Sequence, residues 1–338
     1  MVQGSWLAVN QQSTIHNRHQ KLKIRIFETD KKPRKGLLPI DWVVLGYMLV
    51  TTLVILFTYT KAVNPESMLW GRFQILITML ALWGVYRMWP CRLTFFCRIA
   101  LHLCLLPWWY PDTYEINRIF PNLDHLFASW EQQLFGCQPA LLFYEAVPNT
   151  FVSELLLMGY SCYFPLIAAV SLFYLFCRYK EFERATFIIL ASFFIYYLIF
   201  DLLPVTGPQY YYHAAGLDNI AKGVFPDIGN YFTTHQDKLP IPGDPNGFFH
   251  QFLEAAHEKG ERPTAAFPSS HVGITVILSL LAWHTRNKPL TILALVLLLL
   301  INFATVYLRA HYVIDIIAGW ISAITIYTVL HFFARKFV

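Results

Sequence analysis

The run Leu290-Thr-Ile-Leu-Ala-Leu-Val-Leu-Leu-Leu-Leu-Ile-Asn-Phe-Ala-Thr-Val-Tyr-Leu308 has no charged side chain. It is long enough to cross the hydrocarbon core of a bilayer as one helix. Directly after it comes Arg309-Ala-His311-Tyr-Val-Ile-Asp315, and another apolar run starts at residue 313. Ionisable groups inside or beside membrane spans are costly and tend to mark functional sites. This stretch therefore predicts a membrane protein and a candidate site at one end of its spans.

The composition agrees with a polytopic membrane protein. Of the 338 residues, 56% are hydrophobic and 14% are charged, whereas soluble domains carry about a quarter charged residues. We expect an all-α bundle of eight spans, in which a six-helix phosphatase-like core follows two N-terminal transmembrane helices. The apolar runs lie at about 41–60, 73–89, 93–109, 152–177, 185–203, 269–285, 290–308 and 313–333.

Basic residues indicate which side of the membrane each loop occupies. Eight Lys or Arg residues precede residue 38, and with eight spans the other basic clusters fall on the same side, which the positive-inside rule makes cytoplasmic. The net charge of +5 is explained by these loops, so we expect no nucleic-acid partner. The expected parts are a basic cytoplasmic N-terminus (1–37), a transmembrane hairpin (38–92) and a core (93–333) with extracytoplasmic segments 110–151 and 204–268.

Segment 110–151 contains a helical pattern of apolar residues beside polar ones such as Asn122, Asp124, Ser129 and Gln133. Pro121 suits a first helical turn and Gly136 suits a stop. We expect an amphipathic helix on the outer leaflet of the membrane.

The motif Pro268-Ser-Ser-His271 opens the predicted span at 269–285. Ser269 and Ser270 are favoured N-cap residues, and Pro is tolerated in a first turn. The free N–H groups and the positive end of the helix dipole at such a start favour an anion. For this motif alone, a capped helix with an interfacial histidine is an equally reasonable interpretation.

His311 and Asp315 are four residues apart. On a helix this spacing stacks them on one face, where the carboxylate can accept a hydrogen bond from one ring nitrogen. The other nitrogen is then free to act as a nucleophile or base. An unpaired Asp costs about 2.5–3.5 kcal/mol at mid-membrane, which disfavours a purely structural pair.

The two motifs together resemble the type 2 phosphatidic acid phosphatase superfamily of integral-membrane phosphotransferases. The resemblance rests on Pro-Ser-x-His followed, about forty residues later, by Tyr-Leu-x-x-His-Tyr-x-x-Asp, and it covers roughly residues 93–333. It implies that His311 attacks phosphorus, Asp315 orients His311, and His271 protonates the leaving group. It implies no cofactor.

The chain departs from the phosphatases of that superfamily in its basic residues. Thr305 stands where they carry an Arg, and their Lys-x6-Arg-Pro is missing: the chain's Arg262-Pro263 has Ala255 at the Lys position. Where that basic motif is expected, the chain reads Asp201 to His213. These losses, with Ala304 to Leu308 before Arg309 and Leu134-Phe-Gly136 before Pro139, resemble the inositol phosphorylceramide synthase branch.

The charge of the substrate leads to the same expectation. A phosphomonoester carries nearly two negative charges and needs cationic clamps in its transition state. A phosphodiester carries one, so a helix N-terminus and a single arginine suffice. Arg309 is the candidate clamp, although an interfacial arginine extending to lipid headgroups is the alternative.

Further substrate contacts are expected from Ser269, Ser270, Thr305, Gln209, Tyr210 and Asp201. Segment 204–268 is rich in hydrogen-bonding groups and fits either a cap that recognises a polyol headgroup or a plain solvated loop. Its Asp and His residues show no recurring ligand spacing, so no metal site is predicted.

We therefore expect a membrane enzyme that transfers a phosphoryl-linked headgroup between lipids. The family resemblance suggests phosphatidylinositol as the donor and ceramide or dihydroceramide as the acceptor. The site would face away from the cytoplasm, toward the periplasm in a bacterium or the lumen in a eukaryote. One alternative is a lipid phosphate phosphatase, in which water replaces the acceptor. Another is a lipid-binding or transport protein, which would need no paired nucleophile and acid.

Overall fold

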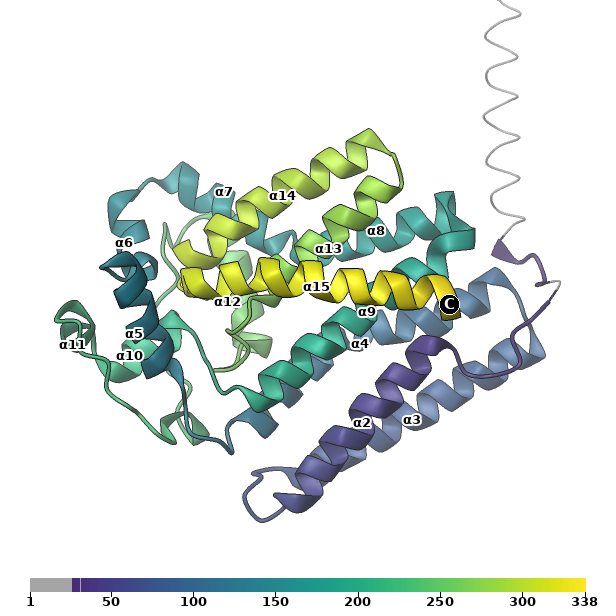
Figure 1. Ribbon diagram of the computed structural model, residues 1–338, viewed down its shortest axis with the longest axis horizontal. Coiled ribbons are helices and arrows are strands. Elements are labelled where there is room, and N and C mark those ends of the chain that lie inside the picture. The colour runs from purple at the N-terminus through teal and green to yellow at the C-terminus, as the bar shows by residue number, and fades with distance from the viewer. Residues whose placement is uncertain (1–25, 31) are drawn as a thin grey trace, which may run out of the picture.

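The structure, a computed structural model, describes residues 26–30 and 32–338, so most of the predicted segment 1–37 lies outside it. The described residues form α-helices and no β-strand (Figure 1). The predicted all-α polytopic bundle is thereby confirmed. Among the described residues, six helices are long and apolar enough to cross a membrane: α2 (Pro39–Phe57), α3 (Pro65–Met88), α4 (Arg92–Asn117), α9 (Tyr179–Leu202), α14 (Lys288–Tyr307) and α15 (Val313–Phe337).

Two of the eight predicted spans differ from single long helices. The run 152–177 is a pair, α7 (Thr150–Ser161) and α8 (Tyr163–Cys177), bent by 45°. Pro165 explains the break, because it cannot donate a backbone hydrogen bond to the carbonyl four residues earlier. The run 269–285 is α13 (Ser270–His284), which has 15 residues. Its length of about 22 Å is less than the hydrocarbon thickness of about 30 Å.

Helix α9 is the centre of the bundle. It packs against α2, α4, α8, α13 and α15, and 78% of its most apolar window is buried inside the protein, compared with 22% for α15. Most of α15 therefore faces outward, where lipid surrounds a membrane protein.

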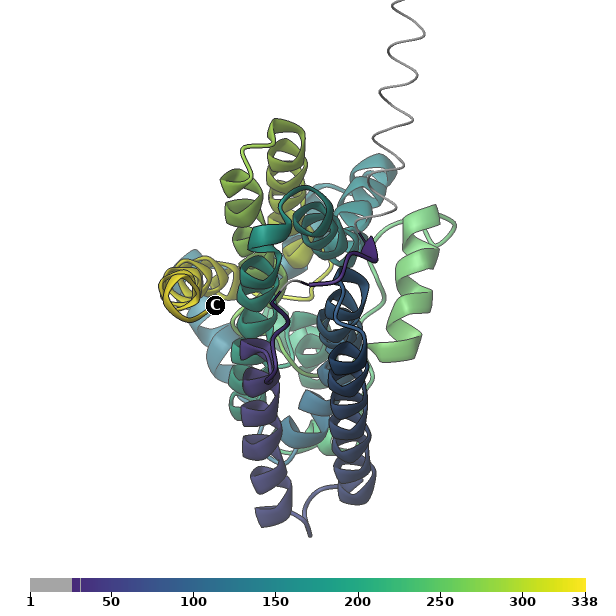
Figure 2. The same cartoon turned by 90° about the vertical axis from the view of Figure 1, so that its right-hand side faces the viewer.

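Shorter helices cover one end of the bundle. They are α5 (Asp124–Phe135), α6 (Pro139–Ala146), α10 (Pro208–Ala215), α11 (Leu217–Ala221), the 3-10 turn η1 (Tyr231–Thr233) and α12 (Phe248–Gly260). Figure 1 shows α5, α6 and α10 grouped beside the junction of α14 and α15. Figure 2 shows α12 on the side of the bundle opposite α15. These helices surround the end at which His271 and His311 lie.

The predicted amphipathic helix of segment 110–151 is confirmed as α5, and Gly136 ends it in a left-handed conformation with φ +70°. Pro121 lies before the helix and not in its first turn. The expected outward polar face is wrong in one respect: Asp124 is fully buried, as is Glu131 on the same face. The reason is that both carboxylates accept hydrogen bonds from other segments inside the protein. Trp130 and Leu134 are exposed instead.

The N-terminal hairpin, α2 and α3, is attached to the core by buried polar contacts. Arg72 of α3 forms an ion pair of 2.6 Å with Asp112 of α4, and Arg98 of α4 forms one of 2.6 Å with Asp41 of α2. Breaking a buried pair typically costs about 3–5 kcal/mol. These pairs therefore hold the two added helices in one arrangement against α4.

Candidate active site

The two histidine motifs meet at the start of α13 and α15. The backbone N–H of Ser269 donates to the carbonyl of Asp315 over 3.0 Å, which joins the loop before α13 to the first turn of α15. Ser269 is the predicted N-cap, and its hydroxyl accepts from the N–H of Val272. As a result, Nδ1 of His271 lies 3.5 Å from Nε2 of His311, although forty residues separate them.

His311 does not lie on a helix, so the expected stacking of His311 and Asp315 on one helical face is wrong. Helix α14 ends at Tyr307 and α15 begins at Val313. Arg309 between them has φ +62°, a left-handed conformation that stops the helix. The N–H of His311 then donates to the carbonyl of Thr305 over 3.1 Å. The imidazole is thus carried by a tight turn.

The acceptor that orients His311 is a backbone carbonyl. Nδ1 donates to the carbonyl of Ala266 over 2.8 Å, and the same nitrogen lies 3.4 Å from Oδ2 of Asp315. That carboxylate oxygen accepts the N–H of Tyr312 over 2.9 Å. A carbonyl can only accept, so Nδ1 carries the proton and Nε2 keeps its lone pair.

Burial sets the charge of His311. The side chain is 3% exposed, and desolvation lowers the pKa of His311 to about 4, against the smaller raising effects of the Ala266 bond and of Glu261. The imidazole is therefore neutral near pH 7. Its unprotonated Nε2 faces His271, the arrangement that a nitrogen nucleophile requires.

His271 is held between aromatic rings. The ring of Tyr160 stacks on it at 4.6 Å between centroids, and the ring of Tyr163 lies at the same distance with a tilt of 43°. His311 meets its edge at 5.7 Å. The ring of His271 is therefore fixed in orientation while its Nδ1 points toward the second histidine.

Two buried carboxylates of α5 hold the turn that carries His311. Asp124 accepts the N–H of Thr206 over 2.7 Å, the N–H of Gly207 over 2.9 Å, and the hydroxyl of Tyr312 over 3.0 Å. Glu131 accepts the first backbone N–H groups of α15, from residues 313 and 314, over 2.9 and 3.1 Å. Burial raises the pKa of both groups, and these donors oppose the rise. Neither residue was expected from the sequence, although their seven-residue spacing puts them on one helical face.

Gly207 fits this site because no side chain can be placed there. It has φ +92°, and a Cβ atom would lie 2.4 Å from the carbonyl oxygen of Ala310. The segment 205–207 can therefore lie directly against the turn of His311. The carbonyl of Val205 in this segment also accepts the N–H of Ala266 over 3.0 Å. This bond positions the carbonyl of Ala266, which binds His311.

A cluster of polar side chains from segment 204–268 lies next to the histidines. Nε2 of Gln209 donates to Glu261 over 3.0 Å, and Nζ of Lys238 donates to Nδ1 of His257 over 2.9 Å. His257 in turn lies 3.8 Å from Glu261. Glu261 is close enough to His311 to influence its pKa. Of these four residues, only Gln209 was predicted. His257 and Glu261 have i,i+4 spacing at the end of α12, a signal that the sequence contains, whereas Lys238 comes from a separate loop.

Three predicted substrate contacts lie at or beside this site. The N–H of Gln209 donates to the carbonyl of Arg309 over 2.7 Å. Tyr210 is buried, with Nζ of Lys238 5.8 Å from its ring centre. Nε of Arg309 is buried and has no hydrogen-bond partner among the described residues. That free donor fits a clamp for an anion, and its role in binding stays a prediction.

The remaining predicted contacts are engaged elsewhere. Thr305 is fully buried, and its hydroxyl donates to the carbonyl of Ile301 in its own helix. Asp201 accepts from the hydroxyl of Tyr47 on α2 over 3.0 Å. The carbonyl of Ser270 accepts from the hydroxyl of Tyr163 over 3.3 Å. Thr305 therefore contacts His311 through its backbone carbonyl and not through its hydroxyl, and Asp201 is bound to α2.

Within residues 26–30 and 32–338, no group of three or more His, Cys, Asp or Glu side chains is arranged to hold a metal ion.

A neutral, buried histidine that faces a second histidine, on a helical membrane scaffold, suits nucleophilic catalysis through a ring nitrogen. The comparison with known families agrees: the family model of the PAP2 superfamily matches residues 125–329. The chain belongs to the PAP2 superfamily, and it is accordingly a phosphatase- or phosphotransferase-like lipid enzyme. The match begins in α5 and leaves α2, α3 and α4 outside. No curated protein and no solved structure matches the chain.

The pH dependence of turnover tests the charge state of His311. As the pH falls, kcat/KM should hold to well below pH 6.5 and then drop toward pH 4, because protonation of Nε2 removes the attacking lone pair. Glu261→Gln removes a group that raises this pKa, so the acid limb should move to lower pH. An acid limb at pH 6.5 or above in the unaltered protein, with folding intact, would contradict the buried neutral imidazole.

Proposed function

We propose that this enzyme moves a phosphoryl-linked headgroup from a phospholipid diester to the hydroxyl group of a second lipid, with phosphatidylinositol as donor and ceramide or dihydroceramide as acceptor. The observation that carries the proposal is the carboxylate of Glu261, which accepts from the side chain of Gln209 over 3.0 Å. The backbone N–H of Gln209 in turn donates over 2.7 Å to the carbonyl of Arg309, in the turn that carries His311. A carboxylate repels a dianionic monoester and accepts hydrogen bonds from hydroxyl groups. It therefore suits a singly charged diester that carries a polyol.

The rest of the polar cluster supports the same substrate class. Gln209, Lys238, His257 and Glu261 together offer donors and acceptors beside the nucleophile. Sites built to bind substrate hydroxyl groups discriminate strongly, because their polar groups are left unpaired by other ligands. Arg309 would hold the single negative charge of the diester through charge-assisted hydrogen bonds.

In the first half-reaction, Nε2 of His311 forms a bond to phosphorus while the bond from phosphorus to the diacylglycerol oxygen breaks. His271, which lies between the rings of Tyr160 and Tyr163, takes up a proton as the anionic diester enters beside it, and it gives this proton to that oxygen. The two nitrogens are 3.5 Å apart, so the entering phosphoryl group separates the rings. The phosphorylated imidazole gains positive charge, which Asp315 stabilises from 3.4 Å.

In the second half-reaction, His271 takes the proton of the acceptor hydroxyl. The acceptor oxygen forms the new bond to phosphorus, and the bond between phosphorus and Nε2 breaks. The cycle returns both histidines to their starting protonation. If water took the place of the acceptor, the same residues would perform the phosphatase reaction, so the acceptor and donor must be tested directly.

Purified protein given phosphatidylinositol and ceramide should form inositol phosphorylceramide and diacylglycerol, with little phosphate released from phosphatidic acid. Glu261→Gln should raise the KM for phosphatidylinositol about tenfold or more, the loss expected for a hydrogen bond to a charged group. Glu258→Gln is the matched control, because Glu258 is an exposed carboxylate in the last turn of α12, the helix that ends just before Glu261. Phosphate release from phosphatidic acid without headgroup transfer, with a further increase in Glu261→Gln, would support the phosphatase instead.

We also propose that catalysis takes place on the extracytoplasmic side. Support comes from the basic residues at the other end of the bundle: Arg34 reaches the carbonyl of Val338 and pairs with Glu183, and Arg178 reaches the carbonyl of Thr285. This end collects the basic clusters that the positive-inside rule assigns to the cytoplasm.

Labelling of Cys137 tests this orientation, because the residue is partly exposed between α5 and α6, at the histidine end. In a variant whose other cysteines are replaced by serine, a membrane-impermeant maleimide should label Cys137 from outside right-side-out vesicles. Labelling from the cytoplasmic side alone would reverse the proposed orientation.

A further inference from the structure

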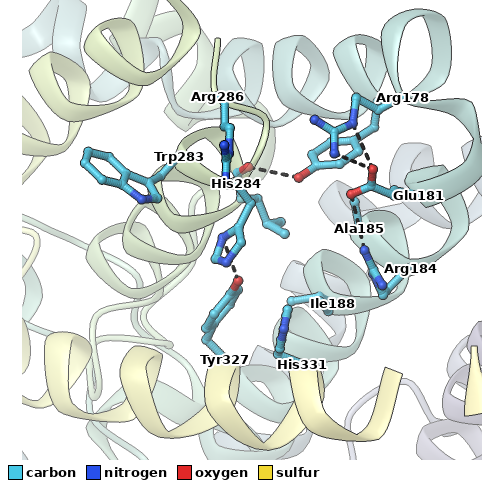
Figure 3. A pocket seen from close by; sticks show the side chains of 12 residues that line it. Arg178, Glu181, Arg184, Ala185, Ile188, Trp283, His284, Arg286, Tyr327 and His331 are labelled. Atoms are coloured by element: carbon cyan, nitrogen blue, oxygen red, sulfur yellow. Dashed lines mark hydrogen bonds and ion pairs between the residues drawn. The ribbon is translucent and has the colours of Figure 1, made fainter. Parts of the chain in front are cut away.

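A second cavity lies at the end of the bundle opposite the histidines. Its volume is about 480 Å³, and its lining includes Arg178, Glu181, Arg184, His284, Arg286 and His331 (Figure 3). Helix α13 connects the two places, because His271 is in its first turn and His284 is its last residue. A helix of this length puts the cavity about 20 Å from the active site. The cavity is therefore not part of the catalytic site.

The cavity carries a net positive charge. Three guanidinium groups and one carboxylate leave +2, even when both imidazoles are neutral. Glu181 pairs with both Arg178 and Arg184, whereas no carboxylate of the described residues pairs with Arg286. The side chains of Arg178 and Arg184 are about one third exposed. The positive groups are thus within reach of a ligand and only partly neutralised.

The lining is also fixed by contacts within the protein. Nη1 of Arg178 donates to the carbonyl of Thr285 over 3.1 Å. The hydroxyl of Tyr327 lies 3.1 Å from Nδ1 of His284, and the ring of His331 stacks on Tyr327 at 5.4 Å. Figure 3 shows Arg178 and Arg184 on either side of Glu181, and His284 directed toward Tyr327. These groups come from α9, α13 and α15 and from the segment before α9, so the cavity is formed by several elements and is not a row of charges along one helix.

Arg286 occupies a backbone conformation that favours glycine. Its φ is +57°, in the turn between α13 and α14, and a left-handed conformation costs a non-glycine residue about 1–2 kcal/mol. Such strain at a non-glycine residue is associated with functional positions. Its guanidinium group lines the cavity, which provides a reason for an arginine at this turn.

The side chains around the cavity are suited to a lipid ligand. Trp283, which also lines it, is 67% exposed, and Val329 and Phe332 on the adjoining part of α15 are 61% and 73% exposed. Tryptophan is typical of the interface between headgroups and acyl chains. Basic pockets between membrane helices are suited to anionic headgroups. Exposed apolar side chains of α13 and α15 therefore occur at the same end of the bundle as the positively charged cavity.

We propose that this cavity binds the phosphate group of an anionic phospholipid from the leaflet opposite the catalytic histidines, with the acyl chains lying along α13 and α15. The arginines provide charge-assisted, bidentate hydrogen bonds to the phosphate oxygens. The bound lipid links the ends of α9, α13 and α15, two of which begin at the active site. This inference does not depend on which lipids the active site uses.

The test is the thermal stability of the purified protein in a neutral detergent. Dioleoylphosphatidylglycerol should raise Tm in a saturable manner, whereas dioleoylphosphatidylcholine and inorganic phosphate at the same concentrations should not. In Arg184→Ala/Arg286→Ala the half-saturating lipid concentration should rise about tenfold or more. The control Lys288→Ala/Lys336→Ala removes two positive charges at the same end, outside the cavity lining, and should keep the unaltered response.

The comparison of variants also excludes binding at the active site, since lipid held there would shift Tm equally in both double variants. Arg286→Gln is measured alongside, so the result does not depend on the folding of the double alanine variant, and it should weaken binding in the same direction. An equal loss in the lysine control would show general surface charge and overturn the proposal. A full Tm shift with inorganic phosphate alone would overturn the assignment to a lipid.

Discussion

The site depends on the hydrogen bond from Nδ1 of His311 to the carbonyl of Ala266. This bond decides which nitrogen carries the proton, and it therefore decides which nitrogen can attack phosphorus. The carbonyl is itself positioned, because the N–H of Ala266 donates to Val205 and the next residues of that segment donate to Asp124. Asp124 also binds Tyr312, beside the nucleophile. The carboxylate of Asp124 thus holds both the segment that positions the Ala266 carbonyl and the turn that carries His311.

The sequence was informative where chemistry requires particular side chains. The spacing of the apolar runs predicted the bundle, and the two motifs predicted the histidines that the structure brings to 3.5 Å. The sequence was less informative where backbone conformation and backbone hydrogen bonds determine the geometry of the site. The left-handed conformation of Arg309 breaks the helix before His311, and the orienting acceptor is a carbonyl, which every residue has. Asp124 and Glu131 have the spacing of an ordinary solvated helix face, and only tertiary packing reveals that backbone N–H groups bury them.

The two ends of the bundle differ in their balance of positive and negative side chains. At the histidine end, Glu261 brings a carboxylate into a cluster with Gln209 and His257. At the other end, arginines exceed carboxylates around an open cavity. Helices α13 and α15 take part in both ends. Under the proposals above, one scaffold presents polyol-binding groups at one end and phosphate-binding groups at the other. The buried ion pairs Arg72 with Asp112 and Arg98 with Asp41 brace this scaffold with the added hairpin.

The most direct test of the central claim is to trap the covalent intermediate and locate it on the imidazole. The protein would be incubated with phosphatidylinositol in the absence of an acceptor lipid, quenched without acid, digested, and analysed by mass spectrometry and by NMR of the modified peptide. The account predicts an inositol-phosphoryl adduct on Nε2 of His311, absent in His311→Ala. An adduct on His271 or on Nδ1 of His311, or steady turnover with no adduct at all, would contradict it.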